Sequence, residues 1–385
     1  MDQFSSNFTL GILGGGQLGK MLLYETRKWD VRTKVLDASV VAPARMACNE
    51  FVLGDLMDFD TVLRFASGVD LLTIEIENVN VAALEHLEKE GLTIYPQPSV
   101  LRTIQHKGRQ KEFYKAHHIP TAPFTRFNNK TELGEAIANG NLSLPLVWKS
   151  AQFGYDGQGV KVIKTQSDLD ILPDGECLAE DLVDFKTELA VIVARNADGE
   201  TKAYPVVEME FHPEANQVEY VICPARVAPE VAQKAQEIAL KVSECFGQVG
   251  LLAVELFQTE DNDILVNEVA PRPHNSGHYS IEASYTNQFE QHLRCILGLP
   301  LGKTESMVAG VMVNLVGAEG HEGPVTYNNM NVVLAMEGVT PHIYGKAETR
   351  PFRKMGHVTI VDTEMSRARA LAQVVKEKVK VVSKN

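Results

Sequence analysis

The sequence predicts an α/β fold with an N-terminal doubly wound parallel sheet, followed by domains of the α+β class. Three observations lead to this prediction. The first hundred residues alternate short apolar strands with helical stretches, which is typical of a parallel sheet. Beyond residue 100 the chain has longer strands, a glycine-rich loop and apparent hairpins. The length of 385 residues is enough for two or three separate cores.

The N-terminal elements follow one another at short intervals. We expect a helix over residues 17–28 and strands over residues 8–13, 33–36, 52–53, 71–76 and 93–95. Pro96 and Pro98 break this alternation, so a domain boundary is expected near residue 100. A second boundary is expected near Pro300. The predicted domains are residues 1–100, 101–302 and 303–385, the last of them rich in strands and ending in a helix over residues 365–379.

The composition argues against several classes of protein. The formal net charge of −13 disfavours a broad nucleic-acid or membrane surface, because such surfaces need clustered positive charge. No apolar run reaches the roughly 18 residues that cross a bilayer, and the N-terminus lacks the regions of a signal peptide. The five cysteines form no CxxC pair, so we expect reduced thiols in a cytoplasmic protein, with neither a disulfide framework nor a zinc site.

A first glycine cluster lies between the first strand and the first helix. Gly14, Gly16 and Gly19 form a GxGxxG pattern, and Asp37 ends the next strand. This is the outline of a dinucleotide fingerprint, in which backbone amides and a helix N-terminus face a phosphate. A lone motif of this kind is weak evidence. It is compatible with an NAD-dependent dehydrogenase, with a ligand-free turn, and with a phosphate pocket for another metabolite.

A second glycine cluster lies between two predicted strands, residues 144–148 and 161–163. Lys149 follows the first strand, and the loop after it has three glycines within residues 154–159. Such a loop can bring its amides close to phosphate oxygens, and a lysine at its root supplies a point charge. The loop therefore favours a nucleotide phosphate site, although a plain hairpin loop has the same outline.

Two glutamates are predicted to face each other across a hairpin. Apolar strands over residues 250–257 and 264–269 flank a turn-like acidic run. Folding the hairpin just after Asp261 puts Glu255 opposite Glu268, with Cβ atoms about 5 Å apart. Two like charges there repel, so one carboxyl is protonated or a cation lies between them. Magnesium prefers carboxylates combined with substrate phosphates, so we predict a nucleotide–metal site. A register shift of one residue would instead separate the pair onto opposite faces.

Arg272 and His274 lie in a stretch with two prolines, directly after the second strand of this hairpin. The prolines hold an extended path, so both side chains project from a stiff segment. A planar guanidinium suits an oxyanion such as bicarbonate, and a histidine beside it can orient the anion or move a proton.

These motifs together resemble the N5-carboxyaminoimidazole ribonucleotide synthetases of the ATP-grasp superfamily. The resemblance rests first on GYDGQG at residues 154–159, on the glutamate hairpin and on NEVAPRPHNSGH at residues 267–278. Further similar segments, in the same order, are GGGQLGKM at residues 14–21, TIEIENV at 73–79, IPTAP at 119–123 and RPFRKMGH at 350–357. The resemblance spans nearly the whole chain and implies a three-domain ATP-grasp architecture, with ATP between the two halves of the central domain.

The resemblance also implies roles for residues at matching positions. The residues implied to contact the phosphates of ATP are Lys107, Lys149, Gly154, Tyr155, Asp156, Gly157, Gln158, Gly159 and Val160. Those implied to border adenine and ribose are Glu180, Asp181, Leu182, Val183 and Glu188. Magnesium would be held by Glu255 and Glu268, with Asn267 in the same motif, and the catalytic residues for bicarbonate and carboxyphosphate would be Arg272, His274 and Lys149. The ribonucleotide would be bound by Gly16, Gln17, Glu75, Glu77, Tyr155, Asp156, Arg272, Lys346, Arg353 and Lys354.

The chain departs from the family pattern at two positions. The family usually has arginine where this chain has Lys107, so the charge is kept but the fork geometry is lost. Many ATP-grasp ligases have asparagine two positions after the second glutamate, where this chain has Ala270. We therefore expect a metal shell that is completed by other groups.

The implied activity is the ATP- and bicarbonate-dependent carboxylation of 5-aminoimidazole ribonucleotide, through carboxyphosphate, in de novo purine biosynthesis. ADP and phosphate are released. The expected small-molecule partners are ATP, bicarbonate and the ribonucleotide, the expected metal is Mg²⁺, and the expected assembly is a homodimer. Alternatives at this stage are a formate-dependent glycinamide ribonucleotide transformylase, a biotin carboxylase, an NAD-dependent dehydrogenase and a non-catalytic nucleotide-binding module.

Overall fold

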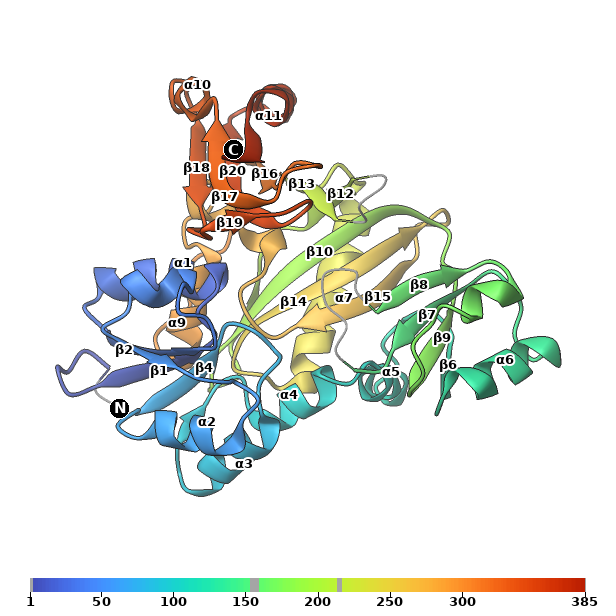
Figure 1. Ribbon diagram of the computed structural model, residues 1–385. Helices are drawn as coiled ribbons and strands as arrows, with labels where there is room; N and C mark the ends of the chain where they lie inside the picture. The colour runs from blue at the N-terminus through green and yellow to red at the C-terminus, as the bar shows by residue number, and fades with distance from the viewer. Residues whose placement is uncertain (1–2, 153–158, 213–216, 385) are drawn as a thin grey trace.

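The computed structural model describes residues 3–152, 159–212 and 217–384 (Figure 1). The N-terminal region is a five-stranded parallel sheet with helices on both faces. Its strands, in spatial order, are β3 (Glu50–Leu53), β2 (Arg32–Asp37), β1 (Thr9–Leu13), β4 (Leu71–Ile74) and β5 (Thr93–Ile94). The predicted doubly wound parallel sheet is confirmed, with strand ends within a few residues of the expected ones.

The helices of this region cover the sheet with their apolar faces. Helix α1 (Gln17–Lys28) has the bounds expected from the sequence, and it turns Leu18, Met21 and Leu22 toward the sheet. This spacing repeats about every 3.6 residues, as an amphipathic helix requires. The other face is covered by α2 (Phe59–Ala66) and α3 (Val81–Lys89), and a short 3-10 helix, η1 (Pro43–Met46), follows β2.

A smaller four-stranded antiparallel sheet follows in the chain. Its order is β6 (Phe124–Phe127), β9 (Cys177–Asp181), β7 (Leu146–Ser150) and β8 (Val160–Ile163). Helices α4 (Pro98–Ile104) and α5 (Lys107–Ala116) lead into it, and α6 (Lys130–Ala138) and η2 (Gln166–Leu169) lie against it. The strand expected over residues 144–148 begins two residues later, so Lys149 lies inside β7 and not after it.

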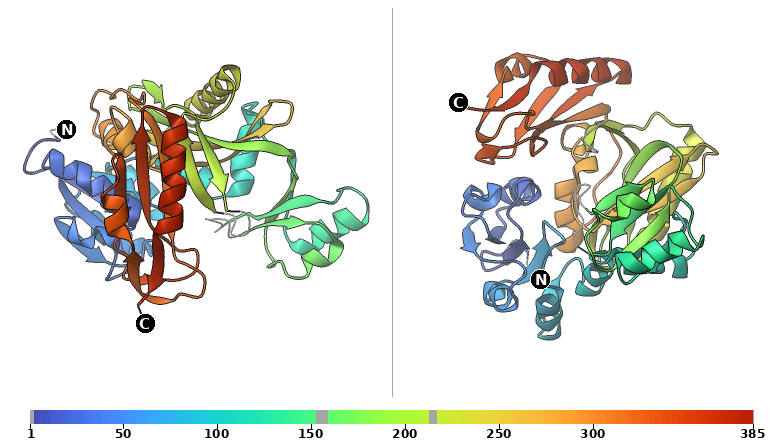
Figure 2. Two further views of the ribbon diagram at one scale, coloured as in Figure 1. Left: turned by 90° about the horizontal axis from the view of Figure 1, so that it is seen from above. Right: turned by 45° about the vertical axis from the view of Figure 1, so that its right-hand side comes forward.

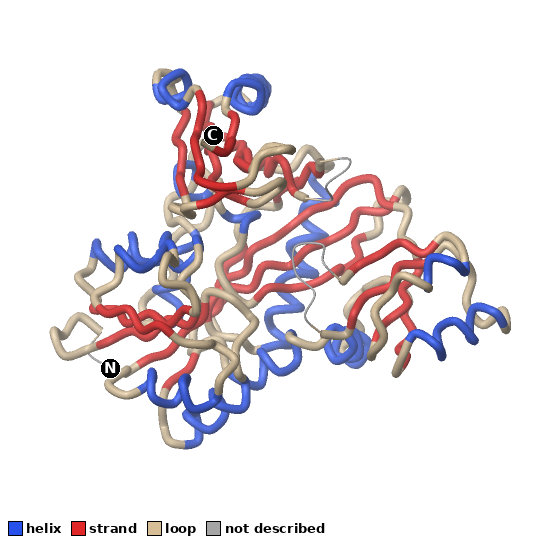
Figure 3. The backbone as a smooth tube through the Cα atoms, in the orientation of Figure 1, coloured by secondary structure: helices blue, strands red, loops and turns tan. Residues whose placement is uncertain are grey.

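A nine-stranded sheet forms the centre of the molecule (Figure 3). Its main path is β15 (Ile264–Ala270), β14 (Gly250–Thr259), β10 (Phe185–Arg195), β12 (Val207–Phe211), β13 (Val218–Cys223), β16 (Ala309–Val316), β20 (Lys354–Asp362) and β18 (Val339–Ile343), with β11 (Thr201–Ala203) paired to β10. Helix α7 (Pro229–Phe246) packs on one face. The connection from β15 contains η3 (Asn275–Gly277), α8 (Ser280–Ala283) and α9 (Gln288–Ile296).

The C-terminal strands extend the central sheet. Strand β16 pairs with β13 on one side and β20 on the other, so the sheet continues across the chain position near residue 303. A three-stranded sheet of β19 (Glu348–Thr349), β17 (Gly323–Asn328) and β21 (Lys380–Ser383) lies beside it. Helices α10 (Met330–Leu334) and α11 (Met365–Lys378) cover the hydrophobic core of the C-terminal region (Figure 2). No helix among the described residues is long and apolar enough to cross a membrane.

Candidate active site

The hairpin of β14 and β15 presents two acidic side chains next to each other. Glu255 pairs directly with Glu268, so the facing predicted from the turn is confirmed. Val254 and Leu256 on either side of Glu255 belong to the core beneath α7. Because side chains alternate along a strand, Glu255 lies on the opposite face of the sheet from that core.

A β-bulge at Asn267 determines this pairing. Near the turn Leu256 pairs with Val266, but the next residue, Glu255, pairs with Glu268. One extra residue, Asn267, is therefore inserted on β15 between the two pairs. Continuing the register of the turn would have put Glu255 opposite Asn267. The symmetric hairpin assumed from the sequence is therefore wrong close to the turn, although the glutamate pair is right. Bulges redirect side chains, and here the Asn267 amide oxygen accepts a hydrogen bond of 2.9 Å from Lys149 Nζ.

The two facing carboxyls differ in their electrostatic surroundings. The Lys107 ammonium, whose Nζ lies 2.5 Å from Glu268 Oε2, is the largest cause that lowers the pKa of Glu268 to about 2. Burial, with the nearby Glu268 and Glu188 carboxylates, raises the pKa of Glu255 to about 8. Burial and Glu268 also raise the pKa of Glu188, on β10, to about 7. Without a cation between them, one member of the facing pair is ionised and the other is neutral.

Three lysines gather beside this pair around Glu180 of β9. Lys149 Nζ lies 3.0 Å from Glu180 Oε2, and Lys111 Nζ lies 3.2 Å from Glu180 Oε1. Lys111 is one turn after Lys107 on α5, so both project from the same side of that helix. Burial lowers the pKa of Lys111 to about 8. Burial would lower the pKa of Lys107 too, but the charges of Glu268, Glu180 and Glu255 leave it raised.

Lys111 is a site residue that the sequence analysis missed. Its spacing of four residues from Lys107 was the available signal, because such a spacing puts two charges on one helix face. The Glu180 side chain was expected to border adenine, yet it lies between two lysines and is buried. Its neighbours Asp181 and Leu182 are exposed, and Val183 is half-buried.

The glycine loop is fixed at both ends by the β7–β8 hairpin. Gly159 has a φ of 76°, a backbone conformation that favours glycine, and its carbonyl accepts a hydrogen bond of 2.8 Å from Ser150 N. Val160 pairs with Lys149. The remaining predicted loop residues lie outside the described ranges; they are Gly154, Tyr155, Asp156, Gly157 and Gln158.

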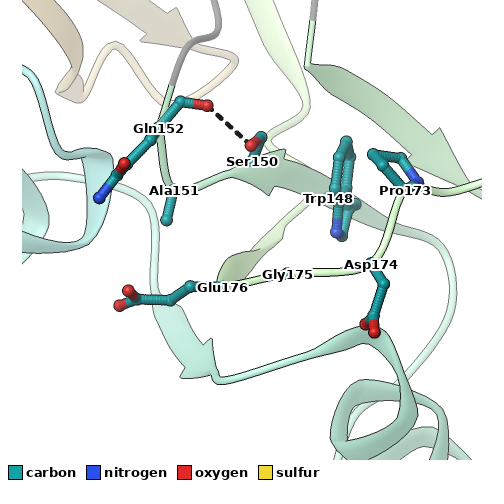
Figure 4. A pocket seen from close by; sticks show the side chains of 8 residues that line it. All are labelled: Trp148, Ser150, Ala151, Gln152, Pro173, Asp174, Gly175 and Glu176. Carbon is teal, nitrogen blue, oxygen red and sulfur yellow. Dashed lines mark hydrogen bonds between the residues drawn. The ribbon is translucent and has the colours of Figure 1, made fainter.

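A cavity of about 300 Å³ lies on the other side of this hairpin (Figure 4). It is lined by Trp148, Ser150, Ala151, Gln152, Pro173, Asp174, Gly175 and Glu176. Trp148 and Lys149 are successive strand residues and point to opposite faces, so the cavity is not on the lysine side. Of its two acidic residues, Glu176 is paired with Arg126 at 2.6 Å, and Asp174 Oδ1 accepts a hydrogen bond of 3.3 Å from Lys130 N. The cavity is therefore separate from the cation cluster.

His274 and Arg272 extend the cluster on the side of the N-terminal region. Ser276 N donates to His274 Nδ1 at 3.4 Å, and Ser276 Oγ lies 3.0 Å from the same nitrogen. With Nδ1 as acceptor, the proton of the neutral ring is on Nε2, which lies 3.4 Å from Glu255 Oε1. Arg272 Nε lies 2.9 Å from Glu77 Oε2. The carboxylates, the lysines and these two residues thus form one continuous polar site.

The first glycine cluster already contains a carboxylate from the chain itself. Glu75 is buried, and its Oε1 accepts a hydrogen bond of 3.1 Å from Leu18 N at the start of α1. A Cβ on Gly16 would lie 2.4 Å from Glu75 Oε1, so the glycine is needed to admit the carboxylate. Gly15 N donates to Asp37 Oδ2 at 2.7 Å. The helix N-terminus of the dinucleotide fingerprint already binds Glu75, and its acidic residue, Asp37, already binds Gly15 N. Both are therefore engaged by groups of the chain itself, which disfavours the dehydrogenase alternative.

The remaining predicted substrate residues occupy two places. Gly16 and Gln17 are half-buried at the start of α1. In the C-terminal region, Lys346 Nζ donates to Lys354 O at 2.7 Å and Arg353 Nη1 donates to Glu348 O at 2.7 Å. Lys20 Nζ of α1 donates to Ile343 O and Tyr344 O at 3.0 and 3.2 Å, so the start of α1 lies beside this basic group.

Comparison with known families divides the chain into three matched segments. Residues 8–105 match the ribonucleotide synthetase preATP-grasp domain, residues 112–289 the ATP-grasp domain, and residues 310–371 the phosphoribosylaminoimidazole carboxylase C-terminal domain.

Similar proteins agree with these matches. The N5-carboxyaminoimidazole ribonucleotide synthase of Bacillus subtilis (strain 168) is 38% identical over 357 residues, which cover 91% of each chain. The phosphoribosylaminoimidazole carboxylase of Saccharomyces cerevisiae is 36% identical, and the match covers 93% of this chain but 64% of that longer protein.

Two solved structures extend the likeness to the fold. The N5-carboxyaminoimidazole ribonucleotide synthetase of Thermotoga maritima superposes with a TM-score of 0.90 at 41% identity, covering 98% of this chain and 100% of that one. The Aspergillus clavatus enzyme, in complex with ADP and 5-aminoimidazole ribonucleotide, gives 0.87 at 34% identity, covering 96% and 98%.

Proposed function

The chain belongs to the N5-carboxyaminoimidazole ribonucleotide synthase family of ATP-grasp ligases, and we infer from this that it uses ATP to carboxylate 5-aminoimidazole ribonucleotide in purine biosynthesis. The similar Aspergillus structure contains ADP together with the ribonucleotide, which supports both substrates for this chain. The observation that carries the assignment to residues is the direct pairing of Glu255 with Glu268 beside Lys107 and Lys149.

The nucleotide is assigned to the space between the small sheet and the central sheet. Lys107 and Lys149 would neutralise its phosphates, together with the loop over residues 154–160. Glu188 would accept hydrogen bonds from the ribose hydroxyls, and Glu180 to Val183 would border adenine. The support is that Lys149, on the small sheet, bonds Asn267 of the central sheet, so the two sheets meet at this cluster.

The facing carboxyls fit a magnesium ion. Glu255 holds a proton in these surroundings because burial and the carboxylate opposite raise its pKa, and a divalent ion would let both carboxyls ionise. No group of three or more histidine, cysteine, aspartate or glutamate side chains suited to a metal occurs in the described part of the chain. A two-carboxylate site suits magnesium, which takes its other ligands from water and substrate phosphates. When bound, magnesium would neutralise the charge on the phosphoryl oxygens.

The first chemical step is the formation of carboxyphosphate. A bicarbonate oxygen attacks the γ-phosphorus of ATP and the bond to ADP breaks. Arg272 would hold bicarbonate through its planar guanidinium, and His274 would donate from Nε2 to the same anion. The support is that His274 Nδ1 is occupied by Ser276 N, which leaves the protonated nitrogen directed into the cluster. Lys149 would stabilise the charge that develops on the transferred group.

The second step transfers the carboxyl group to the ribonucleotide. Its exocyclic amine attacks the carboxyl carbon of carboxyphosphate, or the CO₂ released from it, to form a carbamate, while phosphate leaves and the amine loses a proton. We assign the ribonucleotide to the region where the start of α1 meets the basic group of the C-terminal region. The residues proposed to bind it are Gly16, Gln17, Glu75, Glu77, Arg272, Lys346, Arg353 and Lys354, with Tyr155 and Asp156 outside the described ranges.

ADP release against a panel of amine ribonucleotides tests this function. We expect release that requires both bicarbonate and 5-aminoimidazole ribonucleotide for full rate. Release that requires formate and glycinamide ribonucleotide, or biotin, would favour the other ATP-grasp ligases. Binding of ATP without any release would favour a non-catalytic module.

We further propose a homodimer, a cytoplasmic location and a division into residues 1–100, 101–302 and 303–385. The three matched segments support the division of the chain, and the net charge of −13 suits neither a membrane nor a nucleic-acid surface. Light scattering on the purified chain measures the assembly, and we expect twice the mass of one chain.

A further inference from the structure

A buried glutamine forms hydrogen bonds with the backbone of His274. Gln288 is the first residue of α9 and is fully buried. Its Oε1 accepts a hydrogen bond of 2.8 Å from His274 N, and its Nε2 donates to His274 O at 2.8 Å. One carboxamide therefore holds both the amide and the carbonyl of the same residue, which restrains the backbone on each side of the His274 side chain.

The other hydrogen of this carboxamide is also used. Gln288 Nε2 lies 2.9 Å from Nδ1 of His278. Burial, with smaller effects from His274, His342 and other nearby cations, lowers the pKa of His278 well below its usual range. A neutral His278 offers Nδ1 as an acceptor, so both amide hydrogens of Gln288 have partners.

The surroundings of Gln288 and His278 are closely packed. A Cβ on Gly277 would lie 2.4 Å from Gln288 Oε1 and 2.3 Å from Ile192 Cδ1. The ring of His278 stacks on His357 with centroids 4.6 Å apart, and on Phe289 with centroids 5.9 Å apart. The glutamine and its partners are therefore tightly enclosed.

We propose that Gln288 is a positioning residue for the carboxylation reaction. It holds the backbone of His274 so that the protonated Nε2 of the imidazole faces Glu255 and the space assigned to bicarbonate. This inference rests on the proposed role of His274. Gln288 itself is buried behind the loop, so it acts through His274 and not on a substrate.

The same helix provides a matched control. Gln291 lies on α9, is also fully buried, and holds a loop residue by the same pair of bonds. Its Oε1 accepts from Gly302 N at 2.8 Å and its Nε2 donates to Gly302 O at 3.1 Å. Gly302 is assigned no contact with a substrate. Replacing either glutamine removes the same kind of bonds, but only one of the two loops carries a proposed catalytic group.

The experiment measures ADP release and thermal unfolding for the wild type, Gln288→Met and Gln291→Met. We expect Gln288→Met to lower kcat by about 10- to 100-fold, since a displacement of about 1 Å in a reacting group can cost roughly 100-fold. The KM for ATP should stay within about twofold, because the lysines and Glu188 are untouched. Gln291→Met should lower the melting temperature by a similar amount and leave kcat within about twofold of the wild type.

Equal kinetics in the two variants, at similar melting temperatures, would overturn the proposal, because the role of Gln288 would then be structural alone. If Gln288→Met does not fold, Gln288→Glu decides, measured at a pH at which the introduced carboxyl is ionised, since it then keeps the shape and the acceptor but neither donor. Wild-type kcat in that variant also overturns the proposal, and a selective loss of kcat supports it. A wild-type chain without bicarbonate-dependent ADP release would instead refute the proposed function itself.

Discussion

Two carboxylates of this molecule, Glu75 and Glu255, have contrasting partners. Burial raises the pKa of Glu75, which lies at the N-terminus of α1, although the Arg272 charge and the amides of Leu18, Gly16 and Gly19 favour its charged form. Glu255 lies opposite Glu268, so both burial and its carboxylate neighbours disfavour its charge. The first carboxylate is satisfied by the fold, whereas the second is not.

This difference separates a carboxylate whose charge the fold itself stabilises from a pair of carboxyls that a metal ion would stabilise. A carboxylate at a helix N-terminus stabilises the helix and needs no ligand. When only one of two facing carboxyls is ionised, a divalent cation between them stabilises the ionised form of both and is therefore bound favourably. The glycine cluster was the more familiar sequence signal of the two, yet the glutamate hairpin has the geometry of a ligand site. The following experiments test this contrast.

Glu268→Gln should have the largest effect. It removes the ionised member of the pair and frees Lys107, so we expect ADP release to fall by about 1000-fold, at the upper end for loss of one electrostatic contact to a transition state. ADP formation with and without the ribonucleotide measures it. Glu260→Gln, at the exposed turn of the same hairpin, is the control and should retain wild-type rates. Near-normal turnover in Glu268→Gln would contradict the assignment of the facing glutamates as the metal site.

Lys149→Met should have the next largest effect. The variant removes the cation that bonds both Asn267 and Glu180, and we expect kcat to fall by about 100-fold. Single-turnover ADP formation measures the step itself. Lys164→Met, on an exposed position just after β8, serves as control. An equal response of the two variants would mean that Lys149 has no particular role.

Between about pH 4.5 and pH 8 the stability of the metal-free protein should decrease as the pH rises. Folded Glu255 keeps its proton up to a pKa of about 8, above its ordinary 4.5, so between these values the folded state binds a proton that the unfolded chain has lost. Glu188, with a pKa of about 7, acts in the same direction. Glu268, with a pKa of about 2, contributes stability above pH 4.5 that is lost as the pH falls toward 2.

Melting temperatures with and without Mg²⁺ and ADP test this linkage. We expect Mg²⁺–ADP to raise the melting temperature more at about pH 9 than at about pH 6, where the proton on Glu255 competes with the metal. The free energy of unfolding should change by at most about 1.4 kcal/mol per pH unit for one proton. Glu255→Gln should flatten the difference between the two pH values. An equal rise in melting temperature at the two pH values would show that metal binding displaces no proton from Glu255.

Glu75→Gln should affect stability and leave ATP binding unchanged. Replacing the carboxylate weakens a charge-assisted bond to Leu18 N, so the free energy of unfolding should fall by about 1–2 kcal/mol. The KM for ATP should not change, since Glu75 belongs to the helix end and not to the metal pair. Urea unfolding and initial rates measure both, with exposed Glu88→Gln as control. A large rise in the KM for ATP would contradict the structural assignment.

Lys107→Arg should have the smallest effect. Arginine keeps the positive charge next to Glu268, so kcat/KM for ATP should stay within about threefold of the wild type. Lys107→Met is the matched variant without the charge and should be far slower. A severe loss in Lys107→Arg would indicate that the compact ammonium, and not charge alone, is required.

Local patterns in the sequence were sufficient to predict the N-terminal sheet, helix α1 and the facing glutamates. They were not sufficient for features that depend on distant residues. The bulge at Asn267 goes with a bond to Lys149, which is 118 residues away in the chain. Gln288 at the start of α9 looks like any polar residue in a first helical turn, because only the folded chain brings His274 to it. The pairing of β13 with β16, which continues the central sheet, is likewise a contact between distant segments.

The direct test of the central claim is the binding of manganese, as a spectroscopic substitute for magnesium, in the presence of ADP. Electron paramagnetic resonance counts the bound ion in the wild type, Glu255→Gln, Glu268→Gln and the exposed control Glu260→Gln. The account predicts ADP-dependent binding in the wild type and the control, and severe weakening in both variants of the facing pair. Wild-type affinity in Glu255→Gln or Glu268→Gln would contradict it.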